Sequence, residues 1–463
     1  MNALTYSLVG ALVLLVMALL LVGFFLVLRY ALNRVVDDAA QLLFTEPYSE
    51  NLLEGIIGVR HAGFQNMIEN ELRAAAPAAL SKPIGTHRRY PHLDGLLLNP
   101  AQLWRQPAEE TESVQIETVI GRRAKRPLQV SMPVMASAMG YGIALNKPFS
   151  RAIAKGTAAA QTAFNTGEGP VLPEHRRLAY RLIVQVHSGM WSPSDEMLGQ
   201  ADMVEIHVGQ GASAGVGKFM DKGKIPPQIL QDMGFAAGDT SGTYYKPGKI
   251  DGVRSAADLR RLVEELRQKS HGAPISIKLA ASHHLEADMA MAAEAGVDVI
   301  VLDGAQAGTH SSTAVLVDDF GLPTLYALSR GARFLQQHEL DRTIDLVVSG
   351  GMQTPGDVLK ALALGARAVN MGTAILFAAL HEQIVQALPF EPPTQLAWSS
   401  GTLQDLFDEE EGARSLARFL ANFAEELKIG LRALGKTSLS QLSREDLVAW
   451  QEEAARITGL PLA

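Results

Sequence analysis

The chain has 463 residues, a net charge of −8 and a sequence pI of about 5.9, and it contains no cysteine. The length suits one barrel-sized domain with extensions, and the acidic balance gives no basis for nucleic acid as a partner. The absence of cysteine excludes disulfides, thiolate metal sites, an iron–sulfur cluster held by cysteines of this chain, and a cysteine nucleophile. No metal site is predicted, because the 12 histidines form no HExxH motif.

The first 28 residues carry no charged side chain, and residues 8–28 form an unbroken apolar run. Its 21 residues, at 1.5 Å each, match a hydrocarbon core of about 30 Å. A signal peptide and a buried helix are the alternatives, but a signal peptide carries its basic residues before the apolar core, and here Arg29 and Arg34 follow it. The pattern predicts a transmembrane anchor over residues 1–32. Residues 8–28 would contact the lipid bilayer of the cell membrane in a single pass, with the catalytic domain in the cytoplasm.

An N-terminal extension is expected over residues 33–120, helical at 49–75 and then rich in proline and glycine. From residue 121 to 390 the chain alternates between short apolar strands and helices. The expected strands lie in 128–137, 162–170, 182–189, 201–215, 274–282, 297–312, 345–348 and 367–371. Eight repeated strand–helix units predict an α/β fold, a (β/α)8 TIM barrel. A doubly wound open sheet is the alternative, although no GxGxxG follows the first strand.

Residues 391–463 are expected to form a C-terminal loop and helices. One helix is predicted near 413–434, and a second after the capping-box pattern that begins at Ser443. We expect both helices to pack on the barrel, with partner binding as the alternative.

Two bare backbone turns lie in the last strand–helix–strand unit. Gly350-Gly351 follows the first strand and Gly372-Thr373 the second, and Thr354 is expected to cap the helix between them. Because the strands are parallel, both turns lie at one edge of the sheet, where glycine leaves backbone N–H groups open to an anion that a Cβ would obstruct. Loops after strands seven and eight of a TIM barrel commonly bind phosphate, so we expect a phosphate site here, with ordinary tight turns as the alternative.

Lys278 ends an otherwise apolar strand, where an ammonium is costly unless an anionic group pairs with it. A reduced flavin, which is negatively charged, is one such partner. A carboxylate such as Asp303 or Glu205 is the other possible partner, and the sequence alone does not favour the flavin or the carboxylate.

Six motifs occur in the order and spacing of a known family. They read PVMASAMGYGIALNKPFSRAIAKG, FNTGEGP, VEIHVGQGASAG, ISIKLA, VLDGAQAGT and VVSGGMQTPGDVLKALALGARAVNMGTAIL. Over residues 94–382 the chain resembles the FMN-binding synthase domain of glutamate synthase, and it is most similar to stand-alone versions such as the flavin-type subunit of N-methylglutamate synthase. The resemblance implies FMN as the cofactor and an amino acid, 2-oxo acid or imine as the small-molecule substrate. It implies cofactor-binding roles for Ser137, Asn165, Gln185, Lys278, Asp303, Gly304, Gly350, Gly351, Gly372 and Thr373, and catalytic roles for Lys278 and Glu168, the latter as a proton relay on the substrate side.

The departures from the family pattern lie around the expected substrate. Ser213 and Lys218 replace family residues in QGASAGVGK, His310 lies in a changed AGTHS, and the cysteine-rich loop of the family is missing. Electrons would then not pass through a cluster in this chain, which makes an electron-donor protein a candidate partner. Two hypotheses follow: a membrane-anchored FMN-dependent oxidoreductase, and a non-catalytic flavin-binding subunit or sensor tethered to the membrane.

Overall fold

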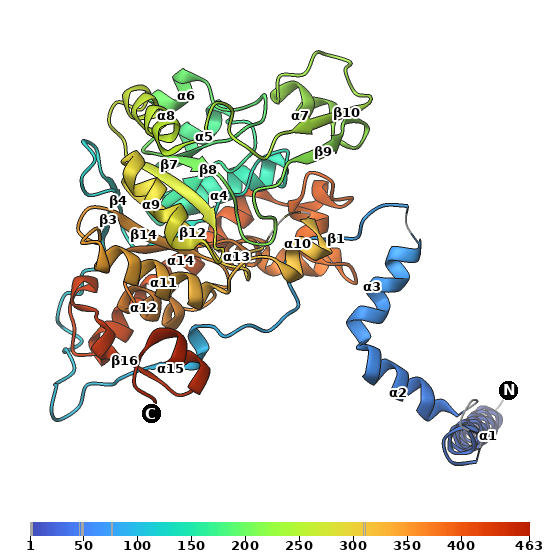
Figure 1. Cartoon of the computed structure of the whole chain (residues 1–463). Coiled ribbons are helices and arrows are strands. Elements are labelled where there is room, and N and C mark those ends of the chain that lie inside the picture. Colours follow the sequence, from blue (N-terminus) through green and yellow to red (C-terminus); the bar gives the residue numbers. More distant parts are fainter. Residues whose placement is uncertain (1–2, 46, 48–50, 76, 309, 311) are drawn as a thin grey trace. The chain divides into compact units, whose positions relative to one another are not determined.

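The computed structural model describes residues 3–45, 47, 51–75, 77–308, 310 and 312–463. The chain divides into two compact units, Met1–Leu80 and Ser81–Ala463 (Figure 1). The described residues of the N-terminal unit include the helices α1 (Ala3–Phe44), α2 (Leu52–Ala62) and α3 (Phe64–Ala75).

Helix α1 is 42 residues long and carries the apolar run predicted for the anchor. Within the described residues it is the one helix long and apolar enough to cross a membrane, and its apolar side chains from Leu8 to Leu28 are largely exposed. The helix does not end at residue 32 but continues to Phe44 through Arg29 and Arg34. An extended apolar surface of this kind suits a lipid environment.

The second unit is built on an eight-stranded parallel sheet. Its strands run in the order β5-β15-β14-β12-β11-β8-β7-β6. They are short and apolar, as is typical of parallel strands that are buried on both faces. The strand bounds are β5 (Val134–Ala136), β6 (Ala163–Asn165), β7 (Arg181–Val186), β8 (Met203–His207), β11 (Ile275–Ala280), β12 (Val299–Asp303), β14 (Asp345–Ser349) and β15 (Ala368–Met371). The outer strands β5 and β6 come together: the Thr162 hydroxyl donates to the Val134 carbonyl, and the Ser131 N–H donates to the Gln161 carbonyl at 3.0 Å. The sheet is therefore a nearly closed TIM-like barrel, which confirms the predicted fold and excludes the open doubly wound sheet.

Helices follow the strands and cover the outside of the barrel (Figure 1). Their bounds are α4 (Lys147–Ala159), α5 (Pro173–Leu178), α6 (Asp195–Gly199), α8 (Ala256–Lys269), α9 (Leu285–Ala295), α10 (Ala314–Asp319), α11 (Thr324–Gln337), α12 (Pro355–Ala363) and α13 (Thr373–Leu380). Thr354 caps α12 as predicted, accepting from the Asp357 N–H at 3.1 Å. An insertion between β8 and α8 forms the antiparallel hairpin of β9 (Lys218–Asp221) and β10 (Thr243–Lys246), with α7 (Pro227–Asp232) between the two strands.

A second hairpin closes the N-terminal end of the barrel. The first predicted strand, 128–137, is in fact two strands: β4 (Leu128–Val130) turns away at Ser131 and pairs antiparallel with β3 (Thr118–Ile120), and only the second half, β5, joins the barrel. Ile120, Leu128 and Val130 pack with inward-facing barrel residues in one buried cluster. This end of the barrel is therefore filled with apolar side chains.

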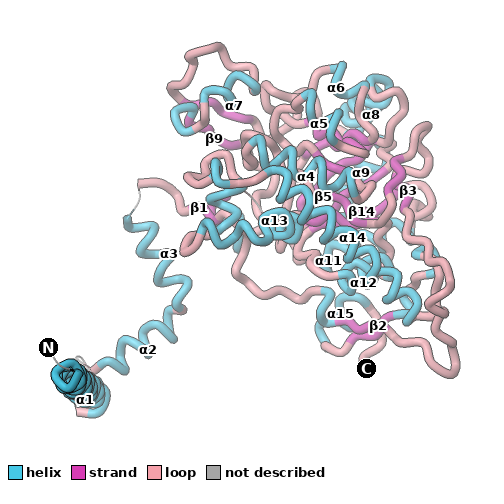
Figure 2. Tube along the Cα trace, turned by 180° about the vertical axis from the view of Figure 1, so that it is seen from behind, coloured by secondary structure: helices cyan, strands magenta, loops and turns pink. Residues whose placement is uncertain are grey.

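The C-terminal segment packs on the barrel, as predicted for its first helix. Helix α14 (Glu409–Ala433) lies against α4, α12 and α13 (Figure 2). The second predicted helix is present but begins later than expected: the Ser443 cap begins only a short 3-10 turn (Arg444–Asp446), after which β16 (Leu447–Ala449) pairs antiparallel with β2 (Leu96–Leu98). Helix α15 (Glu452–Thr458) follows, and another short strand pair joins β1 (Ser81–Lys82) to β13 (Ser312–Thr313).

Candidate active site

The barrel interior is layered because side chains alternate between the two faces of each strand. The lower layer is apolar and contains Met135, Ala163, Ile183, Met203, Val299, Val301, Val347 and Ala368 together with the hairpin residues. The next inward position on each strand is polar, and it follows an apolar inward residue on every strand except β11, where Lys278 follows Ser276. Each barrel strand contributes one residue to this polar layer, at or near its C-terminal end. The layer consists of Ser137, Asn165, Gln185, Glu205, Lys278, Asp303, Ser349 and Asn370.

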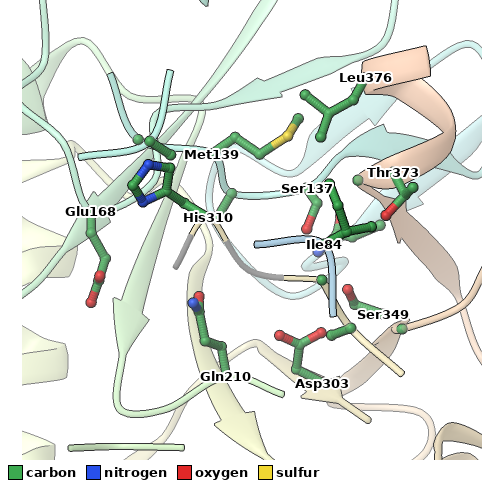
Figure 3. Close-up of a pocket in the computed structure, with 18 of the residues that line it drawn as sticks. Ile84, Ser137, Met139, Glu168, Gln210, Asp303, His310, Ser349, Thr373 and Leu376 are labelled. Atoms are coloured by element: carbon green, nitrogen blue, oxygen red, sulfur yellow. The ribbon is translucent and has the colours of Figure 1, made fainter. Parts of the chain in front are cut away.

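A cavity opens directly above the polar layer, at the C-terminal ends of the strands where TIM barrels carry their chemistry. Its volume is about 1000 Å³ including the open mouth. Figure 3 shows Ser137, Asp303, Ser349 and Thr373 on one side of it, and Glu168, Gln210 and His310 toward the other. Pro83 and Ile84, just after β1, also line the cavity. The residues come from many loops, so the barrel is the scaffold that brings them together.

Lys278 lies at the floor of the cavity and is 1% exposed. Its Nζ is 3.5 Å from Asp303 Oδ2. Burial by itself lowers the pKa of Lys278, but the negative charges of Asp303 and Glu205 outweigh burial, and the pKa is raised. The lysine is thus a permanent buried cation, and the carboxylate partner considered from the sequence is present in the structure.

Three residues of the polar layer are joined by hydrogen bonds beside Lys278. Glu205 Oε1 accepts from Asn165 Nδ2 at 2.9 Å and from Gln185 Nε2 at 2.8 Å. The Asn165 Oδ1 atom in turn accepts from the Gly167 N–H at 3.0 Å, which fixes the turn that carries Glu168. Gln185 lines the cavity, whereas Asn165 and Glu205 lie behind it.

The glycine pair after β14 has positive φ angles, +110° at Gly350 and +73° at Gly351. A Cβ at Gly350 would lie 2.6 Å from Thr324 Oγ1, and a Cβ at Gly351 would lie 3.2 Å from His92 Nε2. The reason for glycine is therefore different from the one inferred from sequence: backbone conformation and protein neighbours require it, rather than access of a ligand alone. Thr324 holds the turn in place, because its hydroxyl donates to the Gly350 carbonyl at 2.9 Å.

The second turn, at Gly372 and Thr373, faces the same cavity. A Cβ at Gly372 would meet only Ser137 Cβ, at an ordinary 3.6 Å, and the residue has a negative φ. Thr373 begins α13, whose first backbone N–H groups have no acceptor within the helix. This end of the cavity therefore combines a helix N-terminus with an accessible backbone, an arrangement that attracts anions.

Glu168 lies on the other side of the cavity among basic groups. Its Oε1 accepts from Lys246 Nζ at 2.8 Å and lies 3.0 Å from His207 Nδ1, and its Oε2 is 3.8 Å from Lys218 Nζ. Burial by itself raises the pKa of Glu168, but the basic groups of His207, Lys218 and Lys246 outweigh burial, and the pKa is strongly lowered. Glu168 is thus an ion at neutral pH.

The altered family positions lie around this end. Ser213 is buried, and Lys218 is one of the cations beside Glu168. His310 lines the cavity, where its ring is 4.5 Å from that of Trp398 and burial lowers its pKa to about 4. His310 is therefore neutral at physiological pH.

Comparison with known proteins identifies the family. The family described as a conserved region in glutamate synthase matches residues 97–437, most of the chain. The chain belongs to the glutamate synthase family. A glutamate synthase large subunit-like protein of Rhizobium meliloti is 33% identical over 425 residues, which cover 87% of this chain and 95% of that protein. An archaeal-type glutamate synthase (NADPH) of Dehalococcoides mccartyi is 30% identical over 391 residues, covering 80% of this chain and 77% of its relative.

Among solved structures, flavocytochrome b2 (the L230A mutant with benzoylformate) is similar at a TM-score of 0.48 and 19% identity, with 77% of this chain and 76% of that chain covered.

The structure of this glutamate synthase family member brings nearly all predicted site residues into one cavity. The exceptions are Asn165, which lies behind Gln185, and Gly304, which packs so closely on Thr324 that a Cβ would lie 2.1 Å from its Oγ1. Sequence reasoning missed other residues that line or support the cavity: Ile84, His92, Lys246, Thr324, Ser349 and Asn370. The period-two rule could have found Ser349 and Asn370, since each lies two residues after an inward apolar residue.

Proposed function

We propose that the chain binds FMN in the barrel cavity and uses it to oxidise or reduce an amino acid, 2-oxo acid or imine. The observation that carries this proposal is a set of buried polar atoms that, among the described residues, have no hydrogen-bond partner. Five of them belong to residues that line the cavity: Gln185 Oε1, Asp303 Oδ1, Gln306 Nε2, His310 Nε2 and Asn370 Oδ1. Such atoms are costly unless a ligand pairs with them, and a polar ring with several donors and acceptors fits them.

The phosphate would lie at the opposite end of the same cavity from Glu168. There, Gly350, Gly351 and Gly372 offer backbone, and Thr373 offers a hydroxyl at the N-terminus of α13. An anion here is favoured by the helix dipole, while Lys278 supplies a full positive charge at the ring end. One cavity thus provides for both parts of FMN.

When bound, FMN supplies hydride transfer. The residues of the chain supply the environment for it. Lys278, held by Asp303, places a fixed positive charge where negative charge develops, which favours the reduced state. Glu168 keeps Lys246 beside the cavity, and Lys218 lies close by. These cations suit an anionic substrate group, in line with the glutamate chemistry in the names of the relatives.

The proposal also concerns location and electron supply. Helix α1 would anchor the chain in the bilayer through residues 8–28, with Arg29 and Arg34 on the cytoplasmic side.

Because the chain contains no cysteine, it has no thiolates of its own to bind an iron–sulfur cluster. Electrons would come from a separate donor protein or from the substrate.

The test is to purify the full chain in detergent, release the bound cofactor with acid and identify it by chromatography. We expect one FMN per chain. Anaerobic addition of candidate amino acids, or of a chemical reductant followed by 2-oxo acid and amine, should then change the visible absorbance of the flavin. Purified protein that neither contains nor takes up FMN would contradict the proposal, and bound FMN that no candidate reduces or reoxidises would favour a non-catalytic subunit.

A further inference from the structure

Glu205 is a fully buried carboxylate that contacts neither solvent nor the cavity. It is 0% exposed, and it belongs to the polar layer between β7 and β11. A single oxygen, Oε1, accepts both of its hydrogen bonds, from Asn165 Nδ2 and from Gln185 Nε2. Burying a carboxylate away from water costs free energy, which suggests that Glu205 has a function in the protein.

The chemistry of these contacts decides which way the Gln185 amide points. The Glu205 Oε1 atom serves as the acceptor for both amides, so the NH₂ group of Gln185 faces Glu205. The other end of the amide, Oε1, then points away from Glu205; it is buried and, among the described residues, has no partner. Because Gln185 lines the cavity, the free atom there is an acceptor and not a donor.

Asn165 shows the same control on the neighbouring strand. Its NH₂ group also faces Glu205, while its Oδ1 accepts from the Gly167 N–H at 3.0 Å. Both oxygens are therefore fixed by one carboxylate, but only that of Gln185 is available to a ligand. The Asn165 oxygen stabilises a turn of the protein, whereas the Gln185 oxygen is directed toward the cavity.

We infer that Glu205 is a positioning residue, which holds the Gln185 carbonyl oxygen toward the cavity so that it can accept from an N–H group of the bound ring. The inference rests on the proposed binding of FMN, whose isoalloxazine ring carries such an N–H. The role belongs to the acceptor oxygen of Glu205 and not to its charge. A glutamine at 205 keeps one carbonyl oxygen, and one oxygen already serves both amides, so it can do the same work.

The experiment compares Glu205→Met with Glu205→Gln in the full-length protein. Methionine has a similar shape but no strong acceptor, so FMN should bind about tenfold more weakly, as expected for the loss of one well-oriented hydrogen bond. Glutamine should keep FMN affinity within about threefold of the wild type. Affinity is measured by quenching of FMN fluorescence on titration into flavin-free protein. Riboflavin, which lacks the phosphate, should lose affinity by the same factor.

A double-mutant cycle with Gln185→Met separates positioning from a general structural role. If Glu205 acts through Gln185, Glu205→Met should weaken FMN binding no further in the Gln185→Met background. Thermal unfolding of each flavin-free variant serves as the control, because a structural role lowers the unfolding temperature whether or not Gln185 is present.

Three results would overturn the inference while the wild type still binds FMN: additive losses in the cycle, equal losses for Glu205→Gln and Glu205→Met, or a loss seen with FMN but not with riboflavin. A wild-type protein that binds neither flavin would instead overturn the proposed function, and this inference with it.

Discussion

Replacing Lys278 by methionine removes the buried cation that is paired with Asp303 at the cavity floor. At 3.5 Å, and with an effective dielectric constant of about 20, the attraction between the two charges is about 5 kcal/mol. Both side chains are nearly inaccessible, at 2% and 4% exposed, so solvent screens the pair little. Breaking a buried pair by removing one partner costs about 3–5 kcal/mol, because the other charge is left uncompensated. We expect Lys278→Met to lower the free energy of unfolding by about that amount.

The pH dependence follows from the direction of the pKa shift. The pKa of Lys278 is raised in the folded protein, so its stabilising contribution is fully present below the unfolded-state value of about 10.4 and is lost as the pH rises through the higher folded-state value. The difference between the wild type and Lys278→Met should therefore stay constant between about pH 6 and 9 and shrink only above about pH 10.4.

Urea unfolding of flavin-free protein in detergent, followed by tryptophan fluorescence, measures this difference. All four tryptophans lie in the barrel unit, so the signal reports on the barrel. The control is the double variant Lys278→Met with Asp303→Asn, which removes the uncompensated charge and should recover much of the lost stability. A loss below about 1 kcal/mol, or a double variant as unstable as the sum of the two single ones, would refute the reasoning.

Four other features can be tested directly. Gly372→Val should abolish flavin binding, because the new side chain fills the anion end of the cavity. Gly356→Val is the matched control, since its Cβ also meets only a 3.6 Å contact but lies outside the cavity, and it should keep flavin binding. Full flavin occupancy in Gly372→Val would contradict the phosphate assignment. Lys278→Met that retains flavin should have a lower reduction potential than the wild type, because the anionic reduced ring loses its cation, and an unchanged potential would count against this role. Full-length protein should fractionate with membranes, and a chain starting near Asn33 should not; equal solubility of the two would argue against the anchor. Purified protein should lack stoichiometric iron and acid-labile sulfide, which elemental analysis checks.

Local sequence signals predicted the barrel and the main residues of its cavity. Short β-branched strands, each followed by a helix, predict parallel pairing. Lys278 could be singled out because a charged side chain in an apolar strand is energetically costly unless it is paired. Ser349 and Asn370 occupy equivalent positions, but short uncharged side chains carry no such signal. Period-two counting from the apolar layer is the rule that finds them.

Other residues depend on tertiary packing that no local pattern encodes. Lys246 reaches Glu168 from an inserted hairpin, and Ile84 lines the cavity from a segment 50 residues before the first barrel strand. The start of the second C-terminal helix was predicted too early for the same reason, since the helix begins only at Glu452. Leu447–Ala449 follows a true capping box, yet it forms a strand, because an edge formed by Leu96–Leu98 is available to pair with it.

The pairing of β2 with β16 has a consequence for how the protein is made. The two strands are separated by almost the whole barrel: Leu98 pairs with Leu447. At a synthesis rate of about 5–20 residues per second, β2 waits roughly 20–70 seconds after leaving the ribosome before its partner exists. The apolar helix α1 emerges earlier still. If α1 enters the bilayer during translation, insertion precedes completion of the barrel, and the nascent chain must keep Leu96–Leu98 from pairing with other strands throughout that interval.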